Sequence, residues 1–466
     1  MTSAVLADER AMGKGLRTSV VAGSIGVLVH WFDWAVYAYM ATTMAKVFFP
    51  EEDGTASLLS VFAVFAIAFF VRPIGSVIFG FLGDRFGRRT TLSLVIVVMA
   101  AGTLMLALIP GHQTIGIWAP ILLIVARVIQ GIAAGGEFGS AATFLAEYSP
   151  ARRRGMGTSW LEVGSVLGFL LASFVVWLLH ATLADDTILA WGWRLPFLIT
   201  VPLALIGLFI RLRVEDTLEY RALEEQNTVP ASPVTEAVRR NGLQILQTIG
   251  IETFMNCTFY VVLVYLLTYQ EEIVALPADD AALLSTIASL VAIALIPLSG
   301  MVSDRVGRKP VLLTAAVLLI VAAIPLFALM RTGTMSAGFV ATALLAAILA
   351  IILGTHSSTV AELFPTRTRQ SGLSIAYSLA SALFAGTLPY INTWLIDLTG
   401  SEMVPAYTLI VVGLVGLVTI LTIPETRGID LLHESDLAPA AAGASAPSSQ
   451  RESRPATGRE SEVEAW

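Results

Sequence analysis

The stretch GFLGDRFGRR at residues 80–89 returns as GMVSDRVGRK at residues 300–309. Each copy lies in a short basic gap between two long apolar stretches. One copy could arise by chance, but two copies at matching places indicate a duplicated membrane bundle. Internal repeats of this kind are typical of secondary transporters, in which the substrate site lies between the repeats. The pattern therefore predicts a protein that moves a small molecule across a membrane.

The composition is that of a membrane protein. The chain has 466 residues, of which 56% are hydrophobic and 14% charged, and its mean hydropathy is +0.78. A soluble domain has about 25% charged residues and lacks apolar runs of about 20 residues, whereas such runs fill most of this chain between Thr18 and Pro424. The net charge of −7 argues weakly against a nucleic-acid partner. Cys257 is the only cysteine, so an intrachain disulfide is impossible.

Twelve apolar stretches are long enough, or nearly so, to cross a bilayer. They are residues 19–44, 56–82, 90–110, 116–147, 156–180, 192–213, 243–270, 281–302, 310–330, 334–362, 370–397 and 404–424. We expect an all-α membrane protein with twelve transmembrane helices in two pseudo-symmetric six-helix bundles. The expected parts are a cytosolic lead (1–18), a first bundle (19–213), a cytosolic inter-bundle loop (214–242), a second bundle (243–424) and a cytosolic, mostly disordered tail (425–466).

Basic residues occupy alternate gaps between the stretches, which predicts the orientation. The gaps on one side contain Arg10, Lys14, Arg17, Arg85, Arg88, Arg89, Arg152 to Arg154, Arg211, Arg213, Arg221, Arg239, Arg240, Arg305, Arg308, Lys309, Arg367, Arg369 and Arg427. The opposite side has only Lys46, Arg194 and Arg331, with acidic residues nearby. By the positive-inside rule the basic side is cytosolic, and both termini lie there. We expect a multi-pass protein of the cell membrane.

Further motifs support the duplication and resemble a known family. EYSPARRR at 147–154 has a counterpart in ELFPTRTR at 362–369. The paired loop signature with twelve stretches resembles the major facilitator superfamily. Several segments resemble its metabolite:proton symporter branch, which includes permeases for alpha-ketoglutarate, citrate, shikimate and proline/betaine. They are WFDW (31–34), RPIG (72–75), ARVIQG (126–131), GGEFG (135–139) and WGWRLPF (191–197). The resemblance covers residues 19–428.

Ionisable side chains inside membrane spans are candidates for function, because each is costly unless it faces a partner or a wet cavity. In a helical register, His30, Asp33 and Tyr37 share one face of the first span, and Arg127, Gln130 and Glu137 share one face of the fourth. The resemblance implies that the first, fourth, seventh and tenth helices line the substrate cavity. The other intramembrane candidates are Glu162, Glu252, Asn256 and His356.

A proton-driven anion carrier needs a fixed cation for the substrate and a group that exchanges a proton. A guanidinium binds a carboxylate through a bidentate fork, while buried carboxyl groups and imidazoles can exchange protons. The predicted substrate-binding residues are Arg127, Gln130, Tyr37, Asn256 and Trp34. The predicted proton-coupling residues are Asp33, His30, Glu137 and Glu162. The alternatives are a static Arg127–Asp33 ion pair and structural roles for Glu137, Glu162, Glu252 and His356.

The repeated signatures predict a gate at the cytosolic mouth. There Asp84 and Asp304 can pair with arginines or with the positive N-terminal end of a helix of the other half. The predicted gating residues are Gly80, Asp84, Arg85, Arg88, Asp304, Arg305, Arg308, Glu147, Arg152, Glu362, Arg367 and Arg72. For Arg72, substrate contact is the alternative.

Two departures from the branch bear on the substrate. Relatives commonly have Glu where this chain has His30, and we expect the added positive character to favour a di- or tricarboxylate over a zwitterion. The segment 431–466 contains three prolines and no apolar heptad, which argues against a coiled coil and modestly against compatible solutes.

The sequence therefore predicts a proton-coupled symporter that imports a small organic carboxylate such as alpha-ketoglutarate by alternating access. The alternatives are a proline/glycine betaine:proton symporter and, further off, another metabolite carrier or a drug efflux pump of the same superfamily. An enzyme is disfavoured because five histidines lack metal-ligand spacing, and a channel leaves the paired signatures unexplained. We expect the partners to be the solute, protons and the lipid bilayer, with no cofactor, no metal, no nucleic acid and no obligate protein partner.

Overall fold

The structure is a computed structural model that describes residues 27–49, 54–75, 78–79, 88–135, 142, 145–146, 149–213, 239–365 and 369–429. Side chains at 88–92, 210–213 and 370–371 lie outside the description. Within these ranges every regular element is helical.

The first half of the chain contributes the helical residues 27–39 and a series of named helices. They are α2 (Ala41–Phe48), α3 (Gly54–Phe70), α5 (Arg88–Leu108), α6 (His112–Ile115), α7 (Trp118–Ala134), η1 (Ala151–Arg153), α9 (Arg154–Thr182), α10 (Asp185–Thr187), η2 (Ile188–Gly192) and α11 (Arg194–Arg213).

The second half continues the series. It contains α14 (Gly242–Phe259), η3 (Tyr260–Tyr265), α15 (Leu266–Glu272), α16 (Ala278–Val306), α17 (Arg308–Met330), α18 (Met335–Glu362), α19 (Arg369–Ala380), η4 (Ser381–Ala385), α20 (Leu388–Thr399) and α21 (Val404–Thr422).

Each of the twelve predicted spans has a helical counterpart among these residues. Within the described ranges, eight continuous helices are long and apolar enough to cross a membrane. A ninth candidate is bent by 48° between Asp185–Gly192 and Arg194–Phe209, and two shorter apolar helices cover Ser93–Leu108 and Trp118–Ala134. The predicted all-α class is confirmed, whereas the domain boundaries stay predictions.

Some helices differ from the predicted spans in length and regularity. The helix α9 has 29 residues, or about 43 Å at 1.5 Å per residue, which exceeds the ~30 Å hydrocarbon thickness. The predicted spans 243–270 and 370–397 are each interrupted by a π-helical turn, η3 and η4. Such turns are frequent near functional sites.

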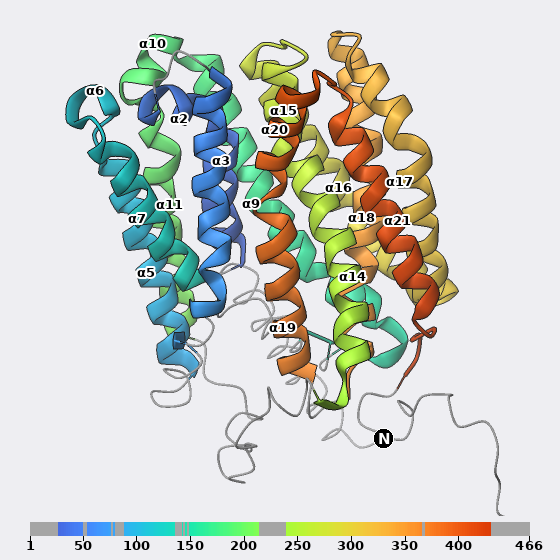
Figure 1. Cartoon of the computed structure of the whole chain (residues 1–466). Coiled ribbons are helices and arrows are strands. Elements are labelled where there is room, and N and C mark those ends of the chain that lie inside the picture. Colours follow the sequence, from blue (N-terminus) through green and yellow to red (C-terminus); the bar gives the residue numbers. More distant parts are fainter. Residues whose placement is uncertain are drawn as a thin grey trace, which may run out of the picture.

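The helices stand side by side as two groups, with the chain's first half on the left and its second half on the right in Figure 1. Two seams join the groups: α9 packs along α16, and α3 packs against α20. The backbones at the α9–α16 seam come very close. They are so close that a Cβ atom added at Gly300 would collide with the carbonyl of Gly155. Glycine at both positions permits this approach, which also places the signature residues after Gly300 against the start of α9.

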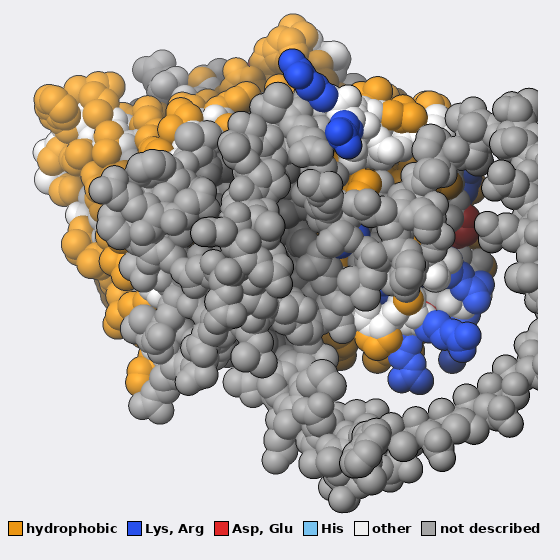
Figure 2. Space-filling view, turned by 90° about the horizontal axis from the view of Figure 1, so that it is seen from below, with side chains coloured by type: hydrophobic (Ala, Val, Ile, Leu, Met, Phe, Trp, Pro, Cys, Tyr) orange, Lys and Arg blue, Asp and Glu red, His pale blue; other side chains and the backbone are white. Residues whose placement is uncertain are grey.

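The surface matches a protein surrounded by lipid. Large apolar side chains such as Leu108, Val321 and Val418 are exposed on the outer faces of the helices. Seen from the end at which α9 and α19 begin, Lys and Arg side chains gather where the described surface is visible, with hydrophobic side chains along the rim (Figure 2). Exposed arginines there include Arg153 and Arg305. The cytosolic assignment of this end stays a prediction.

The two halves repeat one contact in detail. At the start of α9, the Arg154 Nε donates a hydrogen bond to the Ala146 carbonyl at 3.1 Å. At the start of α19, the Arg369 Nε donates to the Ala361 carbonyl at 3.0 Å. Arg154 and Arg369 are the last residues of the duplicated EYSPARRR and ELFPTRTR segments, and Ala146 and Ala361 directly precede these segments, so the two halves repeat this contact at matching positions.

Candidate functional site

A buried polar network connects the first helix with α5 and α7. The two carboxylate oxygens of Asp33 accept hydrogen bonds from Thr103 Oγ1 at 2.6 Å and from Gln130 Nε2 at 2.9 Å. Gln130 Oε1 in turn accepts a hydrogen bond from Arg127 Nη1 at 2.9 Å, and that nitrogen lies 4.0 Å from Asp33 Oδ2. All four side chains are buried. Because they belong to the first helix, α5 and α7, a change in the charge of Asp33 affects the contacts among these three helices.

The Arg127 guanidinium has unused hydrogen-bonding capacity. Its centre lies 3.5 Å from the ring centroid of Tyr37, a cation–π contact. The Nε and Nη2 atoms are buried and have no hydrogen-bond partner among the described residues. Tyr37 itself donates a hydrogen bond to the Val61 carbonyl at 3.0 Å. A change in the charge of Asp33 therefore acts on a cation that is held by few hydrogen bonds.

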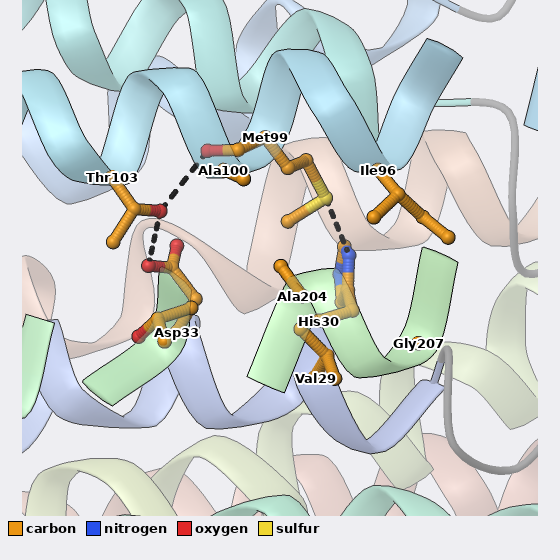
Figure 3. Close-up of a pocket in the computed structure, with 10 residues that line it drawn as sticks. Val29, His30, Asp33, Ile96, Met99, Ala100, Thr103, Ala204 and Gly207 are labelled. Carbon is orange, nitrogen blue, oxygen red and sulfur yellow. Dashed lines mark hydrogen bonds between the residues drawn. The ribbon is translucent and has the colours of Figure 1, made fainter. Parts of the chain in front are cut away.

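His30 lies on the α5 and α11 side of the first helix. Its Nδ1 is 3.4 Å from Met99 Sδ, and its ring stacks on Trp34 with centroids 6.0 Å apart. Figure 3 shows a small pocket at this place, toward which His30 and Asp33 point. The pocket is lined by residues of the first helix, α5 and α11, all in the first half of the chain. This position gives no support to the expectation that His30 adds positive charge beside a substrate between the halves.

Arg72 is buried rather than exposed at the mouth. Its guanidinium lies over the rings of Phe69 at 3.9 Å and Trp34 at 4.3 Å. The Phe69 ring in turn lies 5.6 Å from the ring of Tyr260, which belongs to the second half. Arg72 therefore lies in the interior and not among the exposed charges of the mouth, while both predicted roles, gating and substrate contact, stay predictions.

A second cluster of polar side chains lies between the halves. Glu162 of α9 accepts a hydrogen bond from Ser357 of α18 at 2.9 Å, and its Oε1 lies 3.6 Å from His356 Nε2. Glu252 of α14 interacts electrostatically with Glu162, and Asn256 Nδ2 donates to Glu252 Oε2 at 3.3 Å. We call Glu162 and Glu252 the carboxyl pair. Both acids are buried, and they come from opposite halves of the chain.

Aromatic rings pack further along the same two helices. Phe169 of α9 and Phe259 of α14 have ring centroids 5.0 Å apart. Trp31 of the first helix lies 5.7 Å from Phe169 and 5.4 Å from Phe259. These three rings, the aromatic trio, fill the interior between the halves next to the polar group.

The signature residue Asp304 binds the start of a helix from the other half. Its two carboxylate oxygens accept hydrogen bonds from the backbone N–H groups of Gly155 at 2.8 Å and Met156 at 2.9 Å. These groups belong to the first turn of α9, where the helix dipole and the free N–H groups favour a negative charge. Arg308 Nη1 donates to the same carboxylate at 2.8 Å.

Glu362 is the centre of a buried charge network at the same end. It accepts hydrogen bonds from Arg154 at 3.0 Å, from Arg308 at 3.3 and 3.4 Å, and from Thr426 at 2.7 Å. Arg154 belongs to the first half and the other three residues to the second. We call Asp304, Arg308, Glu362, Arg154 and Thr426 the inner network.

The opposite end of the molecule, which we call the outer end, is bridged by a simpler contact. Thr42 Oγ1 of α2 donates a hydrogen bond to Glu271 Oε2 of α15 at 3.0 Å. This contact again joins the two halves. In the described residues, contacts between the halves therefore bridge both ends of the molecule.

The comparisons with known proteins agree with this architecture. The Sugar (and other) transporter family pattern matches residues 19–241 and 219–436, which is more than half of the chain. The chain belongs to this family. The transporter is 38% identical over 421 residues to the proline/betaine transporter of Escherichia coli (strain K12), covering 88% of this chain and 84% of that protein. It is 37% identical over the same length to the glycine betaine/proline/ectoine/pipecolic acid transporter OusA of Dickeya dadantii (strain 3937), with the same coverage.

Solved structures show the fold of the transporter. The xylose transporter XylE from E. coli, in a partially occluded inward-open conformation, is 21% identical with a TM-score of 0.71, covering 90% of this chain and 100% of that one. The fold is therefore that of the major facilitator superfamily. The family match makes the chain a multi-pass membrane protein, and the family and the relatives named above are transporters. The relatives correspond to the proline/betaine members of the predicted branch and give no support to an alpha-ketoglutarate permease.

The structure brings several predicted residues of the transporter together and leaves others outside its description. Asp33, Arg127, Gln130 and Tyr37 form one group with Trp34 beside them, while Asn256 and Glu162 lie in the interior between the halves. Arg152 and Arg305 are exposed at the end that holds the inner network. Gly80, Asp84, Arg85, Glu137, Glu147, Arg367 and the side chain of Arg88 fall outside the described residues.

Some residues of the transporter's site were not predicted. Thr103, Tyr260, Tyr377 and Ser357 occupy spans in which a single hydroxyl gives no periodic signal. Glu271 follows a span and reads as a solvent-facing loop residue. For these residues the available signal was weak: a polar side chain near a stronger candidate in the same span, as Ser357 directly follows His356.

Proposed function

We propose that the chain is a proton-coupled symporter that takes up a zwitterionic solute of the proline and glycine betaine type by alternating access. The names of the relatives at 37–38% identity support the solute class. The sequence predicted this solute class as the alternative, whereas its main prediction was a small organic carboxylate. The single observation that carries proton coupling is the buried network of Asp33, Gln130, Thr103 and Arg127.

The network offers a way to convert protonation into movement. When Asp33 is charged, it attracts Arg127 and accepts hydrogen bonds from α5 and α7. A proton on Asp33 removes the charge and one acceptor site, so Arg127 loses its counter-ion and the first helix is held less tightly. Because the first helix also carries Trp31 of the aromatic trio, its movement would reach the interior between the halves.

Proton-driven uptake tests the coupling role of Asp33. In proteoliposomes with an acidic exterior, we expect the wild type to accumulate proline and glycine betaine. The Asp33→Asn variant should lose accumulation but keep counterflow, which exchanges solute without a proton gradient. The control Asp279→Asn removes an exposed carboxylate at the start of α16 and should behave as wild type. Accumulation by Asp33→Asn at the wild-type level would contradict the proposal.

A small organic carboxylate such as alpha-ketoglutarate is the second candidate. It is favoured by the two unpaired nitrogens of Arg127, which match a bidentate carboxylate. Competition separates the candidates. Excess unlabelled proline or betaine should inhibit the uptake of labelled betaine, whereas alpha-ketoglutarate and citrate should not. Inhibition by the carboxylates alone would favour the second candidate.

A further inference from the structure

We infer that Glu162 and Glu252, the carboxyl pair, form the subsite for the positively charged nitrogen of the solute, with Arg72 and Tyr260 on its carboxylate. The inference rests on the proposed zwitterion uptake and adds which groups select for it. The carboxyl pair would make the carrier reject anions that lack a positive nitrogen.

Helix geometry places the two acids on facing sides of α9 and α14, one helix from each half. Glu162 and Phe169 are seven positions apart on α9, and Glu252 and Phe259 are seven positions apart on α14. Seven residues are about two helical turns, so each acid shares a face with its phenylalanine. Since the two phenylalanine rings touch and the two acids interact electrostatically, the helices run in the same direction with these faces opposed.

The carboxyl pair lacks a fixed cation. The described contacts of Glu162 are the Ser357 hydroxyl and the imidazole of His356, and that of Glu252 is the amide of Asn256. Among the described residues, no Arg or Lys nitrogen lies within 4.0 Å of either carboxyl group. By contrast, the inner network pairs each of its acids with an arginine. A buried carboxyl group that has no cation beside it stays protonated unless a counter-charge arrives. A positively charged ligand group would supply that counter-charge and favour the ionised form of the pair.

A separate observation indicates where the carboxylate end of the ligand would bind. The Tyr260 hydroxyl is buried and has no hydrogen-bond partner among the described residues. The Tyr260 ring lies 5.6 Å from the Phe69 ring, over which the Arg72 guanidinium lies at 3.9 Å. A donor and a guanidinium at one place match a carboxylate.

Tyr377 connects the two ends of the proposed site. The charges of Arg72, Glu162 and Glu252 all act on its hydroxyl group, so Tyr377 lies near all three. A small zwitterion that lies along Tyr377 would place opposite charges on opposite groups. A di- or tricarboxylate would meet Arg72 but be repelled by the carboxyl pair.

The test compares two ligands of the same shape. Glycine betaine and 3,3-dimethylbutanoate differ in that a neutral carbon replaces the positive nitrogen. Binding to the purified full-length protein is measured by titration calorimetry, for the wild type, Glu162→Gln, Glu252→Gln and the control Glu272→Gln. Glu272 is an exposed acid at the end of the same helical span as Glu252.

We expect the wild type and Glu272→Gln to prefer betaine by at least about tenfold, which is about 1.4 kcal/mol. Either carboxyl-pair variant should lose most of that preference while it still binds 3,3-dimethylbutanoate, and this retained binding shows that the variant is folded. Wild-type preference that persists in both variants would overturn the inference and leave zwitterion uptake standing. A wild type that binds alpha-ketoglutarate but neither betaine nor proline would overturn the proposed function itself.

Discussion

Arg154 and Glu362, from opposite halves of the chain, form a buried ion pair with a nitrogen–oxygen distance of 3.0 Å. The same Glu362 carboxylate accepts hydrogen bonds from Arg308 and Thr426, so one acid links α9, α17, α18 and the segment that follows α21. Because Arg154 begins α9 and Glu362 ends α18, the two halves cannot separate at this end without breaking the pair.

We predict that Glu362→Gln strongly destabilises the described conformation. It leaves Arg154 and Arg308 buried with reduced compensation, and breaking a buried pair costs about 3–5 kcal/mol. The matched control is Glu402→Gln, which breaks the Arg331–Glu402 pair, whose side chains are 44% and 43% exposed. Exposed pairs contribute about 0–1 kcal/mol. Denaturant titration in detergent micelles checks the difference, and equal losses in the two variants would contradict it.

We predict that Asp304→Asn opens the inner end. The substitution removes the negative charge at the first turn of α9 and one of the two acceptors for Gly155 and Met156. In a Cys257→Ala background, spin labels at Arg153→Cys and Arg239→Cys report the distance between the halves, because both positions are exposed. The distance distribution should shift to longer values. The control Asp279→Asn should leave it unchanged, and an unchanged distribution in Asp304→Asn would rule out this role.

We predict that Gly300→Ala impairs transport, whereas Gly242→Ala does not. A Cβ atom at Gly300 would collide with the backbone of Gly155, so the α9–α16 seam cannot close. A Cβ atom at Gly242 meets nothing within 4 Å. Initial uptake rates at equal protein amounts check this, and we expect Gly300→Ala to lose at least about 90% of its rate, since tenfold corresponds to only about 1.4 kcal/mol. Wild-type uptake by Gly300→Ala would show that the seam tolerates a wider spacing.

We predict that Thr42→Val makes the outer end open more often. The substitution keeps the shape of the side chain but removes its hydrogen bond to Glu271, and such a bond contributes about 0.5–1.5 kcal/mol. The open population should therefore rise by about two- to tenfold. Alkylation of a cysteine introduced at Thr268, which is buried in α15, measures this in the Cys257→Ala background. The isosteric Thr419→Val on an exposed hydrogen bond within α21 is the control.

The sequence predicted the groups of the first-half network but not how they connect. Helical periodicity placed Asp33 with Tyr37 and Arg127 with Gln130, and the structure joins these two faces. Thr103 could not be foreseen, because one threonine in an apolar span is usually bound to its own helix backbone, as Thr103 also is to Met99.

Arg72 shows why position along a span is insufficient. The sequence placed Arg72 among the gating residues of the mouth. Its actual location depends on the rings of Phe69 and Trp34, which come from two helices. The π-helical turns η3 and η4 had no local sequence signal either. Tertiary packing decides such features, whereas the number and class of the spans follow from hydropathy and repeats.

The difference between the two closed ends has a consequence for the direction of the cycle. In the described part of the chain, a single side-chain hydrogen bond, Thr42 to Glu271, links α2 and α15 at the outer end, while several charged groups must part at the inner end. Thermal fluctuation of the empty carrier should therefore expose the Thr42 side first. With this bias, the empty carrier is mainly open toward the compartment on that side. Leakage of solute from the other compartment is then suppressed.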